Sequence, residues 1–350
     1  MRSGAPLTVF LLGAGGSVSQ GIHKALRLMH PPARVVAASM DPLGPGLYAA
    51  EAAYVSPGLD DPGWLEWVIE TCRRENARAV LSGVDPLLAR LAAGADEIRR
   101  RGGAVCVVSP PPVLEVGDDK LRTCHWLRER GLPHPRFAAA GDGAAVAELI
   151  EACGYPLLAK PRRGHAAQGQ VTVEGPAALD LIAGRQDLVL QEVLGDPAHE
   201  YTAGCVCDGE GRLRGTIVMR RELREGTTVR AEAGDFPAVR DVAEEVVEAL
   251  APVGPCNVQL REHDGRMVPF ELNVRFSGTT PARTRFGFCE VEATLRHLVL
   301  GEPMPALPRV TEGVVVRYWN ELYPAPAAAA ALRDGGHLDA PEAQLEDWGR

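Results

Sequence analysis

Polar residues at alternate positions of one predicted strand could bind a metal ion and a phosphoryl group. Glu271, Asn273 and Arg275 alternate with the apolar residues Leu272 and Val274. Because successive side chains of a strand point to opposite faces, the three polar side chains would share one face. A carboxylate and an amide oxygen suit Mg2+, which keeps waters and phosphate oxygens as its other ligands. Arg275 could then stabilise charge that develops on a transferred phosphoryl group.

The preceding strand carries two further polar residues, and their placement depends on the loop between the strands. Asn257 and Gln259 come before a predicted turn at 263–265. If this loop has three residues, with Gly265 in the left-handed conformation, register parity puts Asn257 and Gln259 on the face of Glu271. A two-residue loop would put them on the opposite face. A solvated hairpin face without a ligand would show the same alternation.

Lysine is rare in this chain and is a second candidate signal. It occurs only as Lys24, Lys120 and Lys160, so the other 34 of the 37 basic residues are arginine. A compact ammonium group that approaches phosphate is one physical reason to keep lysine. Lys24 lies on a predicted helix face, where chance explains it. Lys120 and Lys160 are candidate phosphate ligands.

The order of these residues resembles the ATP-grasp superfamily, particularly its members similar to the carbamoyl phosphate synthetase large chain and the pyrrolysine-biosynthesis ligase. The matching segments are Asp119-Lys120-x-x-Thr123, Gly154-Tyr155-Pro156-x-x-x-Lys160-Pro161, the loop from Gly164 to Gly169, Gln191-Glu192-Val193-Leu194, Glu200-Tyr201-Thr202, and Gln259 with Glu271-x-Asn273-x-Arg275. They run in family order from residue 119 to about 290, roughly half of the chain. Their joint order carries the resemblance, since no single segment is decisive.

The resemblance implies a role for each matching residue. It implies ATP-phosphate contacts for Lys120 and Lys160, a phosphate-covering loop between Gly164 and Gly169, adenine contacts for Glu192, Val193 and Leu194, and a ribose contact for Glu200. It implies Mg2+, or Mn2+ in its place, on Gln259, Glu271 and Asn273, with Arg275 and Arg221 as catalytic residues. For Arg221, a solvated run of charge is the alternative.

Two features depart from the family pattern. The predicted phosphate loop has His165 and two alanines where relatives often carry glycine or serine, which affects how the loop closes. Gln259 is neutral where many relatives have an acid, which would weaken one metal position. The chain is also too short for the two ATP-grasp units of carbamoyl phosphate synthetase.

The first hundred residues predict a parallel, doubly wound sheet. Apolar strands at 7–12, 34–39, 79–81 and 104–108 alternate with helical stretches at 20–29, 64–76 and 87–101. The turn after the first strand, 13–17, is rich in glycine, and Asp41 follows the second strand, as in dinucleotide-binding units. The third glycine of that fingerprint is replaced by Val18, so a purely structural turn is an equal alternative.

The predicted fold class is therefore α/β followed by α+β. A Rossmann-like domain of the kind that precedes ATP-grasp folds is expected at 1–115, with a boundary near the prolines at 110–112. The resemblance implies an ATP-grasp fold in two parts: a lid and small subdomain at 116–195, and a metal-binding and catalytic subdomain at 196–310. Residues 311–350 are expected to form a C-terminal tail.

Composition and charge limit the classes of partner. The chain has 350 residues, 46% of them hydrophobic, and a net charge of -9, which disfavours nucleic acid and anionic membranes as main partners. No run approaches the length of a membrane span, and the first apolar run is short for a signal sequence, so a cytoplasmic protein is expected. The eight dispersed cysteines predict reduced core thiols, and a homodimer is the default oligomer.

The predicted function is an ATP-dependent carboxylate–amine ligase. The family resemblance implies that ATP phosphorylates a small-molecule carboxylate and that an amine attacks the acyl phosphate, releasing ADP and phosphate. Two alternatives stay open: an oxidoreductase that binds NAD(P) at the glycine turn, and a nucleotide-binding module without turnover.

Overall fold

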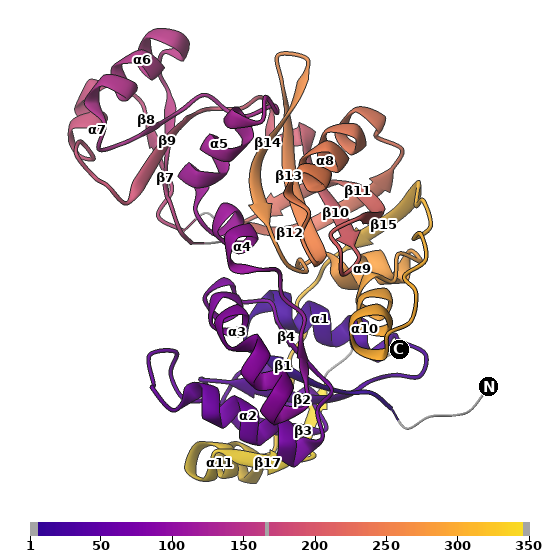
Figure 1. Cartoon of the computed structure of the whole chain (residues 1–350). Coiled ribbons are helices and arrows are strands. Elements are labelled where there is room, and N and C mark those ends of the chain that lie inside the picture. The colour runs from indigo at the N-terminus through magenta and orange to yellow at the C-terminus, as the bar shows by residue number, and fades with distance from the viewer. Residues whose placement is uncertain (1–5, 165–167, 346–350) are drawn as a thin grey trace.

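The computed structural model describes residues 6–164 and 168–345, and its N-terminal part is a six-stranded sheet with helices on both faces (Figure 1). The strand order is β17-β3-β2-β1-β4-β5, with all strands parallel except β17. The strands are β1 (Thr8–Leu12), β2 (Arg34–Ser39), β3 (Ala52–Val55), β4 (Ala79–Ser82) and β5 (Val105–Cys106). The helices are α1 (Ser17–Arg27), η1 (Pro45–Ala49), α2 (Trp64–Glu75), α3 (Asp85–Glu97) and the π-helical turn η2 (Ile98–Gly102). The predicted doubly wound domain is confirmed, although strand β3 was missed.

Alternate residues of the central strand fill two separate cores. Val9 and Leu11 of β1 pack with α1, whereas Phe10 and Leu12 pack with α2 on the other face. All four side chains are buried. Burial on both faces explains why the parallel strands read as continuous apolar runs rather than alternating ones.

Two short helices connect this domain to the rest of the chain. They are α4 (Pro111–Asp118) and α5 (Lys120–Glu129). The prolines at 110–112, predicted to mark a boundary, begin α4, because proline is well suited to the first turn of a helix. Asp119 caps α5 by accepting hydrogen bonds from the backbone N–H groups of Leu121 (3.0 Å) and Arg122 (3.3 Å).

A small four-stranded sheet projects from the molecule beside these helices (Figure 1). Its order is β6-β9-β7-β8 and its pairings are antiparallel. It consists of β6 (Phe137–Ala139), β7 (Leu157–Pro161), β8 (Val171–Val173) and β9 (Leu188–Glu192), with helices α6 (Gly143–Cys153) and α7 (Pro176–Asp180).

A larger antiparallel sheet of order β14-β13-β10-β11-β12-β15 follows. Its strands are β10 (Glu200–Cys207), β11 (Leu213–Arg224), β12 (Thr227–Gly234), β13 (Gly254–His263), β14 (Arg266–Asn273) and β15 (Glu312–Val316). The associated helices are η3 (Pro197–His199), α8 (Pro237–Leu250), α9 (Thr280–Arg285) and α10 (Glu290–Leu300). Together with the small sheet, it gives the predicted two-part fold after the Rossmann-like domain.

The hairpin of β13 and β14 has the shorter of the two loops that the sequence left open. His263 pairs with Arg266, so the loop has two residues, Asp264 and Gly265, rather than three. Both have positive φ, 50° and 70°, as the mirror-image type I′ turn requires. The sequence Asp-Gly between two strands is a strong signal for this turn and favours the two-residue alternative.

A β-bulge restores the predicted pairing despite the shorter loop. The register shifts between residues 259 and 260, so that Gln259 pairs with Glu271 and Asn257 with Asn273. One extra residue in a bulged strand reverses the parity of every residue beyond it. The polar residues therefore face each other as predicted, but for a different reason.

The segment expected to be a tail, 311–350, contributes to both large sheets instead. Strand β15 pairs with β12, and β17 (His337–Asp339) adds an antiparallel strand beside β3. The segment also contains β16 (Leu322–Pro324), α11 (Pro326–Gly335) and β18 (Ala343–Leu345). Leu332 of α11 is fully buried in the N-terminal core, which explains why this alanine-rich stretch is ordered.

Two further predictions concern membranes and thiols. None of the helices in the described residues is long and apolar enough to span a membrane. The eight cysteines are free thiols, and five of them are buried, as predicted for reduced core residues.

Candidate active site

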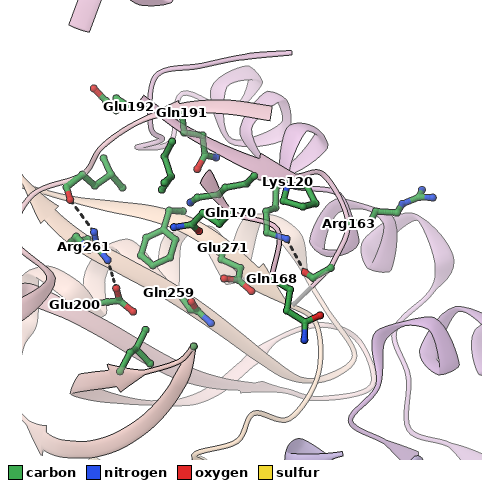
Figure 2. A pocket seen from close by; sticks show the side chains of 18 of the residues that line it. Lys120, Arg163, Gln168, Gln170, Gln191, Glu192, Glu200, Gln259, Arg261 and Glu271 are labelled. Carbon is green, nitrogen blue, oxygen red and sulfur yellow. Dashed lines mark hydrogen bonds and ion pairs between the residues drawn. The ribbon is translucent and has the colours of Figure 1, made fainter. Parts of the chain in front are cut away.

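A cavity of about 190 Å³ lies between the small sheet and the large sheet (Figure 2). Nine of the predicted site residues line it: Lys120, Lys160, Gly164, Glu192, Leu194, Glu200, Arg221, Gln259 and Glu271. They come from α5, from strands β7, β9, β10, β11, β13 and β14, and from the connections after β7 and β9. Residues far apart in the sequence thus meet at one cavity because two sheets face each other.

Lys160 is the most deeply placed cation of this cavity. Its residue surface is only 9% exposed, and its Nζ lies 5.2 Å from the centre of the Phe270 ring. Burial lowers the pKa of Lys160 to about 8, and the negative charge of Glu271 acts in the opposite direction. Within the described ranges, no atom accepts a hydrogen bond from this ammonium group. A buried, charged donor of this kind needs an anionic partner.

Lys120 links α5 to the loop after β7. Its Nζ donates a hydrogen bond to the carbonyl oxygen of Gly164 (2.8 Å), and its backbone N–H donates to Arg162 (2.8 Å). Arg162 in turn forms an ion pair with Asp119 (2.6 Å), the capping residue of α5. These contacts fix the start of the predicted phosphate loop against the helix.

The loop itself is only partly described. Gly164 and Gly169 have φ values of 127° and 71°, where glycine is favoured over other residues. His165 and the two alanines that departed from the family pattern lie outside the described residues. Gln168 and Gln170, beyond them, line the cavity and were not predicted as site residues.

Three largely buried charged side chains, Glu200, Arg221 and Arg261, also line the cavity. Glu200 accepts hydrogen bonds from Arg221 through Oε1 (2.9 and 2.6 Å) and is paired with Arg261 through Oε2. Arg221 also donates from Nη2 to Oε1 of Gln259 (2.7 Å). Sequence reasoning missed Arg261, although it follows Gln259 by two residues. The interactions of Arg221 exclude the solvated charge run as its explanation.

The predicted adenine linker begins at the last residue of β9, one of the two inner strands of the small sheet. Glu192 accepts a hydrogen bond from the backbone N–H of Arg136 (2.8 Å), and Leu194 is buried against Phe270. Val193 is 39% exposed and does not line the cavity. The carbonyl oxygen of Leu194 accepts a hydrogen bond from Arg261 (3.0 Å), which joins the linker to the group around Glu200.

Glu271 and Asn273 lie beside a second cavity, of about 280 Å³, formed by α3, α4 and β14. This cavity shares Lys120, Gly164 and Glu271 with the first one, so the two meet at Glu271. Its other walls are mainly apolar, including Leu88 and Leu114. The Glu271 carboxylate therefore borders both cavities.

Arg275 and Asn257 lie away from the first cavity. Arg275 forms an ion pair with Asp85 of α3 (2.6 Å) instead. Asn257 is buried and accepts hydrogen bonds from Thr202 (2.8 Å) and Arg283. Asn257 pairs with Asn273 across the two strands, as predicted, but Arg283 of α9 covers it, so it does not line the cavity.

The η1 segment packs closely against Ala14 in the glycine turn of the first domain. A Cβ atom at Gly46, in η1, would lie 2.3 Å from the carbonyl oxygen of Ala14. Asp41 accepts a hydrogen bond from the backbone N–H of Leu43 (2.9 Å), so its carboxylate closes a turn. Both features that suggested a dinucleotide have a structural use here.

Comparison with known proteins also indicates an ATP-grasp fold preceded by a separate N-terminal domain. A family model described as the PylC-like N-terminal domain matches residues 10–106, and one described as ATP-grasp in the biosynthetic pathway with Ter operon matches residues 184–322. Residues 184–322 therefore match an ATP-grasp family, in agreement with the predicted fold class. Among curated relatives of this chain, the carbamoyl phosphate synthase large chain of Rubrobacter xylanophilus is 26% identical over 335 residues. The match covers 85% of this chain but only 30% of that relative.

Solved structures support the ATP-grasp fold across nearly the whole chain. N5-carboxyaminoimidazole synthetase from Staphylococcus aureus, complexed with ADP, superposes with a TM-score of 0.68 at 13% identity, covering 95% of this chain and 86% of that one. The biotin carboxylase domain of 2-oxoglutarate carboxylase from Hydrogenobacter thermophilus, with MgADP, gives a TM-score of 0.66 at 18% identity. That match covers 85% of this chain and 71% of the domain chain.

Proposed function

We propose that this protein is an ATP-dependent ligase that joins a small-molecule carboxylate to an amine and releases ADP and phosphate. The observation that carries the proposal is the convergence of two ammonium groups and one carboxylate, from Lys120, Lys160 and Glu271, on one cavity. Opposite charges of this kind fit a polyphosphate held together with a divalent cation.

The donor set of the cavity fits MgATP. Lys160 is nine-tenths buried and lacks a hydrogen-bond acceptor among the described residues, so a phosphate oxygen would complete its environment. The proposed Mg2+ ligands are Glu271, Asn273 and Gln259, with Mn2+ as a substitute. Gln259 already accepts a hydrogen bond from Arg221, but an amide oxygen has a second lone pair. Bound Mg2+ would neutralise phosphate charge during transfer.

The remaining predicted residues have roles at the nucleotide. We propose that the segment Glu192 to Leu194 binds adenine and that Glu200 binds the ribose. Both oxygens of Glu200 are held by arginines, yet a carboxylate has about four acceptor sites in all, so hydroxyl groups can still bind. The Gly164 to Gly169 loop would cover the phosphates and exclude water from the reaction.

The proposed reaction has two steps. First, a carboxylate oxygen of one substrate attacks the γ-phosphorus, and the bond to the β-phosphate oxygen breaks to release ADP. The amine nitrogen then attacks the acyl carbon, phosphate leaves, and the nitrogen loses a proton to give the amide. Arg221, at the cavity wall beside Gln259, would stabilise the transferred group electrostatically. The protein contributes mainly positioning, so no nucleophile–base pair is required.

A release assay tests the proposal. ADP and phosphate are measured with Mg2+, ATP and a pooled panel of carboxylic acids and amines, for the wild type and for Glu271→Ala. We expect release that requires both an acid and an amine and that falls at least 100-fold in the variant. Glu262→Ala is the matched control, because Glu262 lies on the same hairpin, is partly exposed and does not line the cavity.

The outcomes separate the ligase from its alternatives. Release by Glu271→Ala at the wild-type rate would contradict the metal assignment. Stabilisation by MgATP without turnover would favour a non-catalytic binding module. Stabilisation by NAD(P) alone would favour the oxidoreductase, since a ligand that binds only the folded state raises its stability.

Several coarser properties are proposed with this function. We propose domain boundaries at 1–115, 116–195 and 196–310, which limited proteolysis would test. A cytoplasmic location and a homodimer are proposed as well, and sedimentation of the purified protein would test the oligomeric state.

A further inference from the structure

We propose that Asp85, in the N-terminal domain, is a positioning residue for the metal-binding pair Glu271 and Asn273 and acts through Arg275. This inference rests on the proposed function. It couples the first domain to the metal position, a connection that no sequence pattern indicated.

The first link is a two-point ion pair between domains. Oδ1 of Asp85 accepts a hydrogen bond from Nε of Arg275 (2.6 Å), and Oδ2 accepts one from Nη2 (3.1 Å). The Arg275 side chain is only 9% exposed, so solvent screens the pair weakly. A bidentate pair fixes the plane of the guanidinium as well as its position. Asp85 therefore determines how Arg275 is oriented.

The second link runs from Arg275 to the predicted metal ligands. Nη2 of Arg275 also donates to Oδ1 of Asn273 (2.8 Å), and Nη1 donates to the carbonyl oxygen of Phe276 (3.1 Å). Nδ2 of Asn273 donates to Oε1 of Glu271 (3.3 Å). These partners orient the Asn273 amide with its nitrogen toward Glu271 and its oxygen toward Arg275. Only that oxygen can bind Mg2+, through the lone pair that Arg275 leaves free.

The donors of Arg275 are largely committed to protein acceptors. Four of its five N–H groups donate hydrogen bonds: one from Nε and one from Nη2 to Asp85, one from Nη2 to Asn273, and one from Nη1 to the carbonyl oxygen of Phe276. Arg275 thus acts as a bridge between α3 and the end of β14 rather than as a free cation in the cavity. This differs from the catalytic role that the family resemblance implied for it.

The surrounding backbone is packed closely enough to make such a bridge specific. A Cβ at Gly117, in α4, would lie 2.8 Å from Cγ2 of Val274 and 3.1 Å from the carbonyl oxygen of Leu272. The end of β14 is therefore held against α4, while Asp85 contacts it from α3. Partners that orient metal ligands in this way change metal affinity about 10–100-fold when they are removed.

Calorimetry with a non-hydrolysable ATP analogue tests the proposal. The analogue is titrated at a series of Mg2+ concentrations and, separately, in EDTA. We expect Asp85→Asn to raise the Mg2+ concentration for half-maximal binding about tenfold and to leave the affinity in EDTA within twofold of the wild type. Glu97→Gln is the matched control: it lies on the same helix and its carboxylate also pairs with an arginine, Arg101, but at an exposed site.

A double-mutant cycle separates coupling from a merely structural contact. If Asp85 acts through Arg275, the variant Asp85→Asn with Arg275→Met needs no more Mg2+ than Arg275→Met alone. Multiplied effects, or an Asp85→Asn protein that melts earlier but keeps the wild-type Mg2+ dependence, would overturn the proposal. A wild type that binds no analogue would overturn the proposed function itself, so the two failures are distinguishable.

Discussion

At the scale of single residues, the buried charge of Lys160 destabilises the ligand-free protein. An ammonium group is buried beside an aromatic ring, and the nearby Glu271 carboxylate compensates for its lost hydration only in part, because the pKa of Lys160 is still lowered to about 8. A ligand-free protein is therefore destabilised by the charge that its nucleotide would use. Removal of this charge should therefore raise the free energy of unfolding and weaken nucleotide binding.

We predict that Lys160→Met stabilises the ligand-free protein at pH 7 by about 3 kcal/mol while weakening MgATP binding. The folded pKa, about 8, lies below the ordinary value of 10.5. Between these values the unfolded chain binds more protons, so wild-type stability rises with pH there and the advantage of the variant shrinks. Urea unfolding from pH 7 to 10.5 measures this difference. Lys24→Met, at an exposed lysine, is the control, and a pH-independent difference would refute the prediction.

Residue identities and spacing indicated nine of the nineteen residues that line the first cavity, but not their charge partners. Lys120, Lys160, Gln259 and Glu271 could be found because each belongs to a segment with a recognisable order. Asp85 could not, since it lies 190 positions from Arg275 and no local pattern links them. Long-range ion pairs depend on how domains pack, which spacing along a chain does not encode.

At the scale of elements, the hairpin shows that two different loop lengths can place the same polar side chains on one face of the sheet. The predicted three-residue loop and the observed two-residue loop with a bulge give the same parity, because each adds one residue to the pairing. Parity arguments count residues and do not locate where the extra one lies. The prediction of a C-terminal tail differs from the structure for another reason. Alanine and proline dominate this segment, and its burial comes from contacts with the N-terminal sheet.

We predict that Leu332→Ala lowers the free energy of unfolding by 2–5 kcal/mol, because it leaves a cavity in the N-terminal core. The matched control is Leu181→Ala, at a leucine that is 84% exposed, which should change this free energy by no more than about 0.5 kcal/mol. Chemical denaturation of both variants provides the measurement. Equal effects would show that α11 does not pack on the sheet in solution.

At the scale of the whole molecule, the chain corresponds to one ATP-grasp unit with its preceding domain. It spans 30% of the carbamoyl phosphate synthase large chain that it matches, and its α/β sheet has a glycine turn that its own η1 segment packs against. The nucleotide cavity instead lies between the two later sheets. The position of this cavity and the packing of η1 against the glycine turn together predict how many nucleotides one chain can bind.

We therefore predict that one chain binds one molecule of a non-hydrolysable ATP analogue in the presence of Mg2+. Calorimetry gives this ratio directly, and excess NAD should neither displace the analogue nor raise the melting temperature. The physical reason is the close approach of Gly46 to the carbonyl oxygen of Ala14, because η1 packed against Ala14 crowds the glycine turn. Two analogues per chain, or a melting temperature that NAD raises while the analogue is saturating, would mean that η1 moves away from the turn. The N-terminal sheet would then be a binding domain in its own right, and not only the support from which Asp85 reaches the metal position.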